Sequence, residues 1–230
     1  MPTRANVIDV HAPSRLGQEE NAIASGTSDN HGTMARRKSI MPSPAGHILG
    51  GTFVYLIGTS PQQRSNLIMT VTLLGSVAPD FDFVPGIVIG EPGAFHHGVS
   101  HSLGFAILFG TLVCLFLRYF RCGVGLARAT IMAALAYGLH AVLDGVSVNE
   151  GARSVPLLWP LSQHEFGINF GLWGHFHHDG LADGLWSVLR PDNLSALIRE
   201  LAVLGIPPLL IYFVRAKSVD TGSGNGRVSK

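Results

Sequence analysis

Two residues with metal-ligand chemistry, His140 and Asp144, lie four positions apart in the otherwise apolar stretch 136–144. On a helix, positions i and i+4 share a face, so the imidazole and the carboxylate can hold one metal ion or bridge two. A buried hydrogen-bonded pair without a metal is the alternative for this motif alone. Because Asp144 comes near the apolar end of a predicted membrane helix, where an unpaired charge is costly, the functional interpretation gains weight.

A second pair of acids, Asp80 and Asp82, follows Pro79 at the end of another apolar stretch. Two carboxylates one residue apart can both bind a cation, or one can bind while the other acts as an orienting or general-base group. We therefore treat both as candidate catalytic residues as well as candidate ligands. A solvated turn is the alternative, although the interleaved Phe81 and Phe83 make a simple wet loop a poor description.

The densest histidine cluster is formed by His96, His97 and His101, in the segment 96–102. His96 and His101 are five residues apart and do not share one helix face. We expect His96 in a loop and His101 in the first turn of a helix, with Ser100 as its cap. His97 is expected to be exposed, and a histidine-rich surface loop is the alternative for the whole cluster.

Five stretches without Asp, Glu, Lys or Arg must position these residues. They cover residues 48–63, 65–79, 102–117, 129–143 and 201–214. Each is shorter than the roughly 20 residues that span a bilayer comfortably. Only 13% of the chain is charged, against roughly 25% in average soluble proteins. We predict an all-α polytopic membrane protein with four to five short transmembrane or membrane-embedded helices, in preference to a soluble helical protein. Pro207-Pro208 predicts a kink or break in the last stretch.

If these stretches cross the membrane alternately, the charged residues of their loops separate by side. One side receives Arg64, Arg118, Arg121, Arg128, Arg215 and Lys217, and the other receives Asp80, Asp82, Glu91 and Asp144. Under the positive-inside rule the arginine side is cytoplasmic, which places the acids on the non-cytoplasmic face. The basic run Arg36-Arg37-Lys38 opposes this orientation, unless the chain begins at Met41.

The same alternation gathers seven candidate metal ligands at one end of the helices. They are His47, Asp80, Asp82, His96, His101, His140 and Asp144. None is a cysteine, so the donors are nitrogen and oxygen, which suit zinc best and also manganese, iron or cobalt. A closed structural zinc site needs four ligands. Seven candidates therefore leave room for one or two ions and for an open catalytic position.

The rest of the chain sets domain boundaries and excludes several classes of protein. We expect a disordered polar tail over residues 1–40, a membrane-embedded domain over 41–215 with an interfacial loop region at 145–200, and a flexible tail over 216–230. Met34 and Met41 are both candidate start residues. The net charge of +1 argues against nucleic-acid binding, and two cysteines exclude a disulfide scaffold.

A further histidine group occupies residues 174–180, where His175 and Asp179 are again four apart. Gly174 and Gly180 flank the group, so a loop is favoured over a helix. We interpret His175, His177 and His178 as a surface loop, with an accessory metal or substrate contact as the alternative. His164 is interpreted in the same way.

Taken together, these motifs resemble a known family. The ordered features are residues 41–47, the exit at 79–82, His96-x-Gly98-x-Ser100-His101-Ser102, His140-x-x-x-Asp144 and residues 157–162. Over residues 41–190 the chain resembles the YdjM-type, LexA-regulated bacterial membrane proteins, predicted metal-dependent hydrolases of the inner membrane. That family usually has Arg where this chain has His97, and Thr where it has Ser100. The resemblance implies a hydrolase-like domain but no particular substrate.

A fainter similarity links the chain to zinc-dependent phospholipase C and P1-type nucleases. Those helical enzymes also use an Asp, a His fourteen residues later and an H-x-x-x-D helix, as Asp82, His96 and the His140/Asp144 pair do here. Their additional His-x-x-x-Glu pair has only a loose counterpart in His175/Asp179.

Three hypotheses of different classes follow. The first is hydrolysis of a phosphoester or related bond in a lipid or membrane-adjacent substrate, with membrane lipid as the partner. The second is a non-enzymatic metal-binding or metal-transporting membrane protein. Transport would need polar residues at bilayer depth on the arginine side as well, where the stretches offer little beyond Thr70, Thr72 and Thr111. The third is a structural membrane protein, which would bind no stoichiometric metal.

Overall fold

The computed structural model describes residues 43–91, 94–123, 125–148, 154–168, 170 and 191–223, and the regular elements of this part are helices, apart from an isolated β-bridge between Val155 and Phe166. The α-helices are α2 (Pro44–Gly58), α3 (Asn66–Val77), α4 (Phe83–Val88), α5 (Leu103–Tyr119), α6 (Leu126–Gly145), α7 (Pro191–Glu200) and α8 (Ile206–Ser223). Short 3-10 turns η1 (Pro61–Gln63) and η2 (Ala78–Asp82) flank α3, and a π-helical turn η4 (Leu201–Gly205) joins α7 to α8. The predicted tail 1–40 and the histidine group at 174–180 lie outside the described residues.

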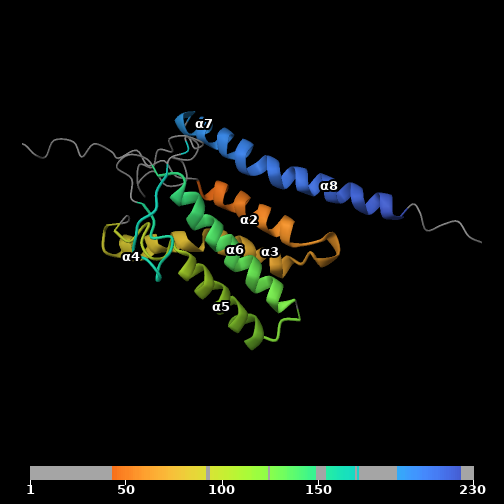
Figure 1. Cartoon of the computed structure of the whole chain (residues 1–230), viewed down its shortest axis with the longest axis horizontal. Coiled ribbons are helices and arrows are strands. Elements are labelled where there is room, and N and C mark those ends of the chain that lie inside the picture. The colour runs from red at the N-terminus through yellow and green to blue at the C-terminus, as the bar shows by residue number, and fades with distance from the viewer. Residues whose placement is uncertain are drawn as a thin grey trace, which may run out of the picture. The chain divides into compact units, whose positions relative to one another are not determined.

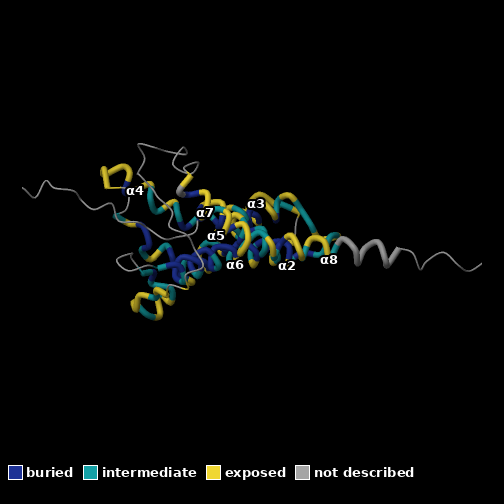
Figure 2. Tube along the Cα trace, turned by 90° about the horizontal axis from the view of Figure 1, so that it is seen from above, coloured by how far each residue is buried: buried dark blue, intermediate teal, exposed yellow. Residues whose placement is uncertain are grey.

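Helix α6 is the centre of the fold and packs against α2, α3 and α5 (Figure 1). Small residues permit its close contacts: a Cβ added to Gly75 of α3 would lie 2.4 Å from the carbonyl oxygen of Ala133. A Cβ on Gly110 of α5 would lie 2.8 Å from the Ala134 Cβ. Glycine at such positions lets neighbouring helix backbones approach, as is common between membrane helices. Figure 2 shows buried positions concentrated along α6.

The helices have the length and surface of membrane-embedded segments. Three continuous helical segments are long and apolar enough to cross a membrane, Asn66–Val88, Leu126–Gly145 and Asn193–Arg215, and α5 is a shorter apolar helix. Large apolar side chains such as Ile107, Phe116 and Phe213 are exposed on the outer faces of α5 and α8. Such surfaces suit lipid better than water. The chain is an integral membrane protein, and the predicted all-α membrane fold is confirmed.

The C-terminal helix differs from the sequence prediction in form. Pro207-Pro208 does not end the helix; the irregularity is the π-helical turn Leu201–Gly205 immediately before it. A proline ring clashes with the carbonyl of the residue four positions earlier, and a widened turn relieves such a clash. The predicted loop region 145–200 also ends early, because residues 191–200 form α7, and the predicted tail from 216 begins within α8.

The start of α5 corrects another expectation. Ser102, not Ser100, is the N-cap, and its hydroxyl accepts a hydrogen bond from the Phe105 N–H at 3.2 Å. His101 therefore lies in the loop, one residue before the cap. The next free N–H groups, of Leu103 and Gly104, donate to the carbonyls of Leu157 and Trp159. The segment 157–159 thus completes the helix end that the chain enters directly after His101.

Helix direction separates the charges as the sequence predicted. The start of α2, the end of α3, the start of α5 and the end of α6 meet at one end of the bundle, which carries the histidines and acids. At the opposite end lie Arg64, Arg118 and Arg128, close to the ends of α2 and α5 and the starts of α3 and α6. Arg215 joins this arginine end, since its guanidinium donates to the Thr59 carbonyl beside the end of α2.

Candidate metal centre

All seven predicted ligands converge at the histidine end of the bundle. His47 lies in the first turn of α2, Asp80 and Asp82 lie in η2, and His140 and Asp144 lie in the last turns of α6. His96 and His101 come from the loop between α4 and α5. Three overlapping groups within this set, together with His97, have ligand atoms close enough to hold a metal ion: His96, His97 and His101; His47, His140 and Asp144; and Asp80, His101 and His140.

The hydrogen bonding of His140 fixes which of its nitrogens faces the cluster. Its Nδ1 lies 2.7 Å from the carbonyl oxygen of Ser76. A carbonyl only accepts, so Nδ1 carries a proton, and in the neutral ring Nε2 presents a lone pair. That lone pair faces the Asp144 Oδ2 at 3.1 Å and the Asp80 Oδ1 at 3.4 Å. Lone pairs opposed at this distance repel one another unless a proton or a metal ion lies between them.

His101 has the same arrangement, built from different residues. The Ser100 hydroxyl donates to Asp82 Oδ2 at 2.7 Å, and the His101 Nδ1 lies 3.2 Å from that same carboxylate oxygen. An Nδ1 proton directed at Asp82 leaves Nε2 as the free donor atom. This Nε2 is 3.3 Å from the His140 Nε2 and 3.2 Å from Asp144 Oδ2. Two oriented imidazoles therefore present lone pairs to one point.

The spacing of these atoms matches a coordination sphere. Four donors placed tetrahedrally at zinc–ligand distances of about 2.0–2.1 Å are separated by about 3.3 Å. The distances among Asp80 Oδ1, His101 Nε2, His140 Nε2 and Asp144 Oδ2 run from 3.1 to 3.8 Å over the five pairs given by the structure. Both Asp144 oxygens are buried and have no hydrogen-bond partner. The residues present thus fit a divalent metal ion.

Charge in the centre also favours a cation. His101 and Asp144 are almost fully enclosed, with exposed side-chain fractions of 0% and 2%. Burial disfavours the charged imidazole of His101, yet the carboxylates of Asp144, Asp80 and Asp82 outweigh it and raise its pKa to about 11, so a proton occupies Nε2 until a metal ion displaces it. No Lys or Arg contributes to the described ion pairs of the centre. The site is therefore built to attract positive charge.

Asp82 lies beside this centre and contacts two of its histidines, His96 and His101. Asp82 Oδ1 lies 3.0 Å from the Nδ1 of His96, whose ring stacks on Phe83 with centroids 3.8 Å apart. Asp82 thus contacts the outer nitrogen of two histidines. Carboxylates in this position orient imidazole ligands and raise their basicity.

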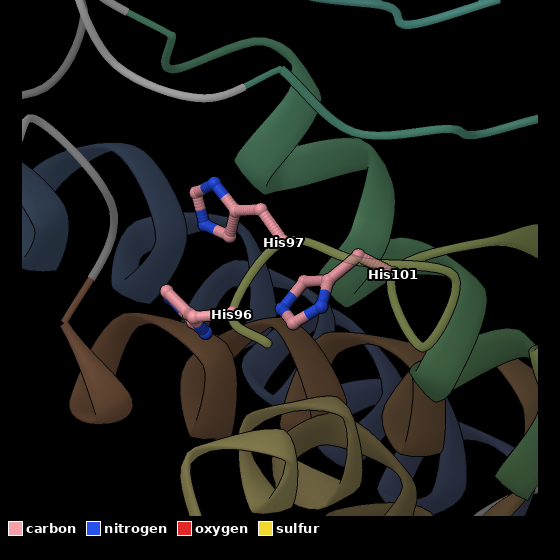
Figure 3. Close-up of side chains that lie close together, drawn as sticks. All are labelled: His96, His97 and His101. Atoms are coloured by element: carbon pink, nitrogen blue, oxygen red, sulfur yellow. The ribbon is translucent and has the colours of Figure 1, made fainter. Parts of the chain in front are cut away.

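Sequence reasoning missed His97, which was expected to be exposed. Its side chain is 7% exposed, and its Nε2 lies 4.0 Å from the Asp144 Oδ2. The loop makes this possible by placing His97 at a positive φ of 61°, an uncommon conformation for a residue with a side chain. Figure 3 shows His96, His97 and His101 gathered on this loop. Apart from the neighbouring histidines, no pattern in the sequence predicted the left-handed conformation of His97.

Glu200 is a second buried polar residue that the sequence did not bring to notice. Its carboxylate accepts hydrogen bonds from both the backbone N–H and the hydroxyl of Ser43. Ser43 is the N-cap of α2, and its carbonyl accepts from the backbone N–H of His47. Glu200 therefore ties the end of α7 to the helix start that presents His47. The available signal was an acid directly before the apolar stretch at 201–214.

Comparison with known proteins identifies the family. The model of the YdjM inner membrane protein family matches residues 41–217. The chain belongs to this family. No curated protein and no solved structure matches the chain. All seven predicted ligands of this YdjM family member lie within the matched residues. His164 lies there too, but it is exposed, and its backbone N–H donates to the Ser162 hydroxyl.

Proposed function

We propose that this YdjM family member is a membrane-bound metal-dependent hydrolase. The observation that carries the proposal is the convergence of the His101 and His140 Nε2 lone pairs with the Asp80 and Asp144 carboxylates at spacings of 3.1–3.8 Å. These four residues would hold the ion, with zinc the best match to the nitrogen and oxygen donors and manganese, iron or cobalt as alternatives. A metal in such a site lowers the pKa of bound water to about 7 and polarises a scissile phosphoryl or carbonyl group.

The protein's own groups divide the remaining tasks. Asp82, together with Ser100, holds His101 in the tautomer that directs Nε2 inward. The Ser76 carbonyl does the same for His140. Asp80 is the most accessible of the acids, with 28% of its side chain exposed against 2% for Asp144. Substrate would therefore approach beside Asp80, the carboxylate best placed to exchange protons with a reacting group.

The surroundings of Asp80 favour a substrate with an apolar part. Phe81 is 63% exposed, directly between the two acids, and Val84 and Val88 of α4 are exposed as well. Exposed apolar side chains beside the access route can contact an acyl chain or the membrane surface. We therefore propose a phosphoester or related bond of a lipid or membrane-adjacent molecule as the substrate class.

A metal transporter is less consistent with the interior of the bundle. Below the centre, the described core consists of apolar residues, among them Val71, Met132 and Ala136. The Thr72 hydroxyl nearby is engaged with the carbonyl of Ile68 in its own helix. A conduction path would need polar ligands along this route. The described residues offer a binding site at one end and an apolar barrier behind it.

We further propose that the centre faces away from the cytoplasm, in the bacterial inner membrane. The support is the segregation of Arg64, Arg118 and Arg128 at the opposite end of the helices. Arginine-rich loops remain in the cytoplasm under the positive-inside rule. An enzyme with this orientation would act on lipids of the outer leaflet of the inner membrane or on envelope molecules outside it.

The direct test uses detergent-purified protein reconstituted in liposomes and assayed with zinc against a panel of phosphomonoester and phosphodiester lipids. Asp144→Asn should lose both turnover and bound metal while still inserting into membranes. Asp82→Asn should keep most of the metal and lose turnover, because it disturbs orientation and not the ligand set. His164→Gln is the matched control and should behave as wild type. Full hydrolysis by Asp144→Asn would contradict the proposal.

A further inference from the structure

Asp144 has an unusual environment for a single carboxylate. Both of its oxygens are buried without hydrogen-bond partners. Each oxygen faces different imidazoles: Oδ2 lies 3.1 Å from the His140 Nε2, whereas Oδ1 lies 3.3 Å from the His47 Nε2. Each oxygen of a buried carboxylate needs a hydrogen-bond donor or a cation, since a buried oxygen without a partner is costly. One ion among Asp80, His101 and His140 would satisfy only Oδ2.

His47 is the residue that faces the other oxygen of Asp144, Oδ1. Its side chain is 3% exposed, its Nδ1 is buried without a hydrogen-bond partner, and its Nε2 faces Asp144 Oδ1. The ring stacks on that of His140, with centroids 3.6 Å apart and planes 19° apart. Stacking holds the two rings face to face. The Nε2 of His47 is directed at Asp144 Oδ1 and the Nε2 of His140 at Oδ2. His47 is therefore oriented as a ligand outside the first set of four.

His97 approaches the Oδ2 atom of the same carboxylate. Its left-handed backbone turns the ring into the cluster, and its Nε2 comes to 4.0 Å from Asp144 Oδ2. Left-handed conformations are unfavourable for residues with side chains, and they persist at functional sites where the surroundings enforce them. The turn thus brings a further imidazole to the Oδ2 side of Asp144, where the first set of donors lies.

We propose that the centre holds two divalent cations that share Asp144 as a bridging carboxylate. Asp80, His101 and His140 surround the first ion on the Oδ2 side of Asp144, and His47 faces the second ion on the Oδ1 side. This inference rests on the metal centre of the proposed function and makes it more specific. Paired metal ions about 3.5–4 Å apart are suited to phosphoester hydrolysis, because together they stabilise the attacking and the leaving oxygen. The pair therefore favours a phosphoester among the substrates of the proposed function.

Metal counting on the full-length chain tests this proposal. Detergent-purified protein is loaded with zinc, freed of excess metal by gel filtration and analysed for zinc and protein. Wild type should hold two zinc ions per chain, and His47→Gln should hold about one. The His164→Gln control should hold two. One zinc ion in wild type, unchanged in His47→Gln, would overturn the second ion while leaving the proposed hydrolase intact; absence of zinc from wild type would overturn both.

A second readout gives its decisive result on wild-type protein alone. Two manganese ions bridged by one carboxylate are magnetically coupled, whereas isolated ions give independent spectra. Wild-type protein loaded with manganese should therefore show a coupled electron paramagnetic resonance signal, and His47→Gln should show the spectrum of an isolated ion. An isolated-ion spectrum in fully loaded wild type would overturn the shared carboxylate.

Discussion

The two ends of the bundle handle buried polar groups in opposite ways. At the arginine end, Arg215 donates hydrogen bonds to the carbonyls of Ile57 and Thr59, so a cation of the protein itself satisfies the last turn of α2. At the histidine end, the Nε2 atoms of His101 and His140 face each other and the Asp144 carboxylate. The protein supplies the cation at one end, and at the other it supplies only donors of electron pairs.

This difference separates a structural role from a binding role. Donors and acceptors that complement one another, as at Arg215, stabilise the packing of α8 on α2 without a ligand. Acceptors that converge on one another destabilise the fold until something positive joins them. The histidine end is therefore the part of the molecule whose stability we expect to depend on metal, and the arginine end the part whose stability does not.

The largest expected difference is that the two ends of the bundle face opposite sides of the membrane. In a background of Cys114→Ser and Cys122→Ser, Gly123→Cys reports on the arginine end and His164→Cys on the histidine end. Both positions are exposed, and the site of a Gly123 side chain is open. A membrane-impermeant maleimide should label only His164→Cys in spheroplasts and only Gly123→Cys in inverted vesicles. Labelling of both positions from one side would contradict the opposed ends.

A smaller effect is expected from loosening the orientation of one ligand. Ser100→Ala removes the hydroxyl that donates to Asp82 Oδ2 at 2.7 Å, while every direct ligand remains. Loss of such outer contacts typically weakens metal affinity about 10–100-fold. Competition with a fluorescent chelator measures the change, and Ser162→Ala at the same end is the control. Unchanged affinity in Ser100→Ala would remove Asp82 from the support of His101.

The smallest effect should come from the arginine end. Arg215→Gln gives up charged hydrogen bonds to the end of α2, which should lower the free energy of unfolding by about 1–2 kcal/mol. Thermal melting followed by circular dichroism measures this, with Arg118→Gln as the control. Metal affinity should not change. A parallel loss of metal binding in Arg215→Gln would show that the two ends are coupled and would contradict their separate roles.

Much of this arrangement was readable from the sequence because it depends on helix direction alone. Alternating apolar stretches must return to the same end, so His47, Asp80 and the His140/Asp144 pair were expected to meet. The i, i+4 spacing of His140 and Asp144 further predicted their contact, which the structure gives as 3.1 Å.

The remainder depends on features that residue types do not encode. The inward position of His97 follows from a left-handed backbone turn, and the orientation of His140 follows from the Ser76 carbonyl, which any residue could supply. The division between Asp80 and Asp82 is likewise set by the geometry of η2, since both residues are aspartates one position apart. Glu200 reaches Ser43 only because α7 packs near the start of α2, 157 residues away in sequence.

Elemental analysis of detergent-purified wild type beside His140→Ala tests the central claim most directly. The opposed lone pairs at the histidine end require a cation, and His140 contacts both Asp80 and Asp144 there. The account predicts at least one tightly bound transition-metal ion per wild-type chain and its loss in His140→Ala, with Arg215→Gln retaining the wild-type content. A metal-free wild type, or equal metal in wild type and His140→Ala, would contradict it.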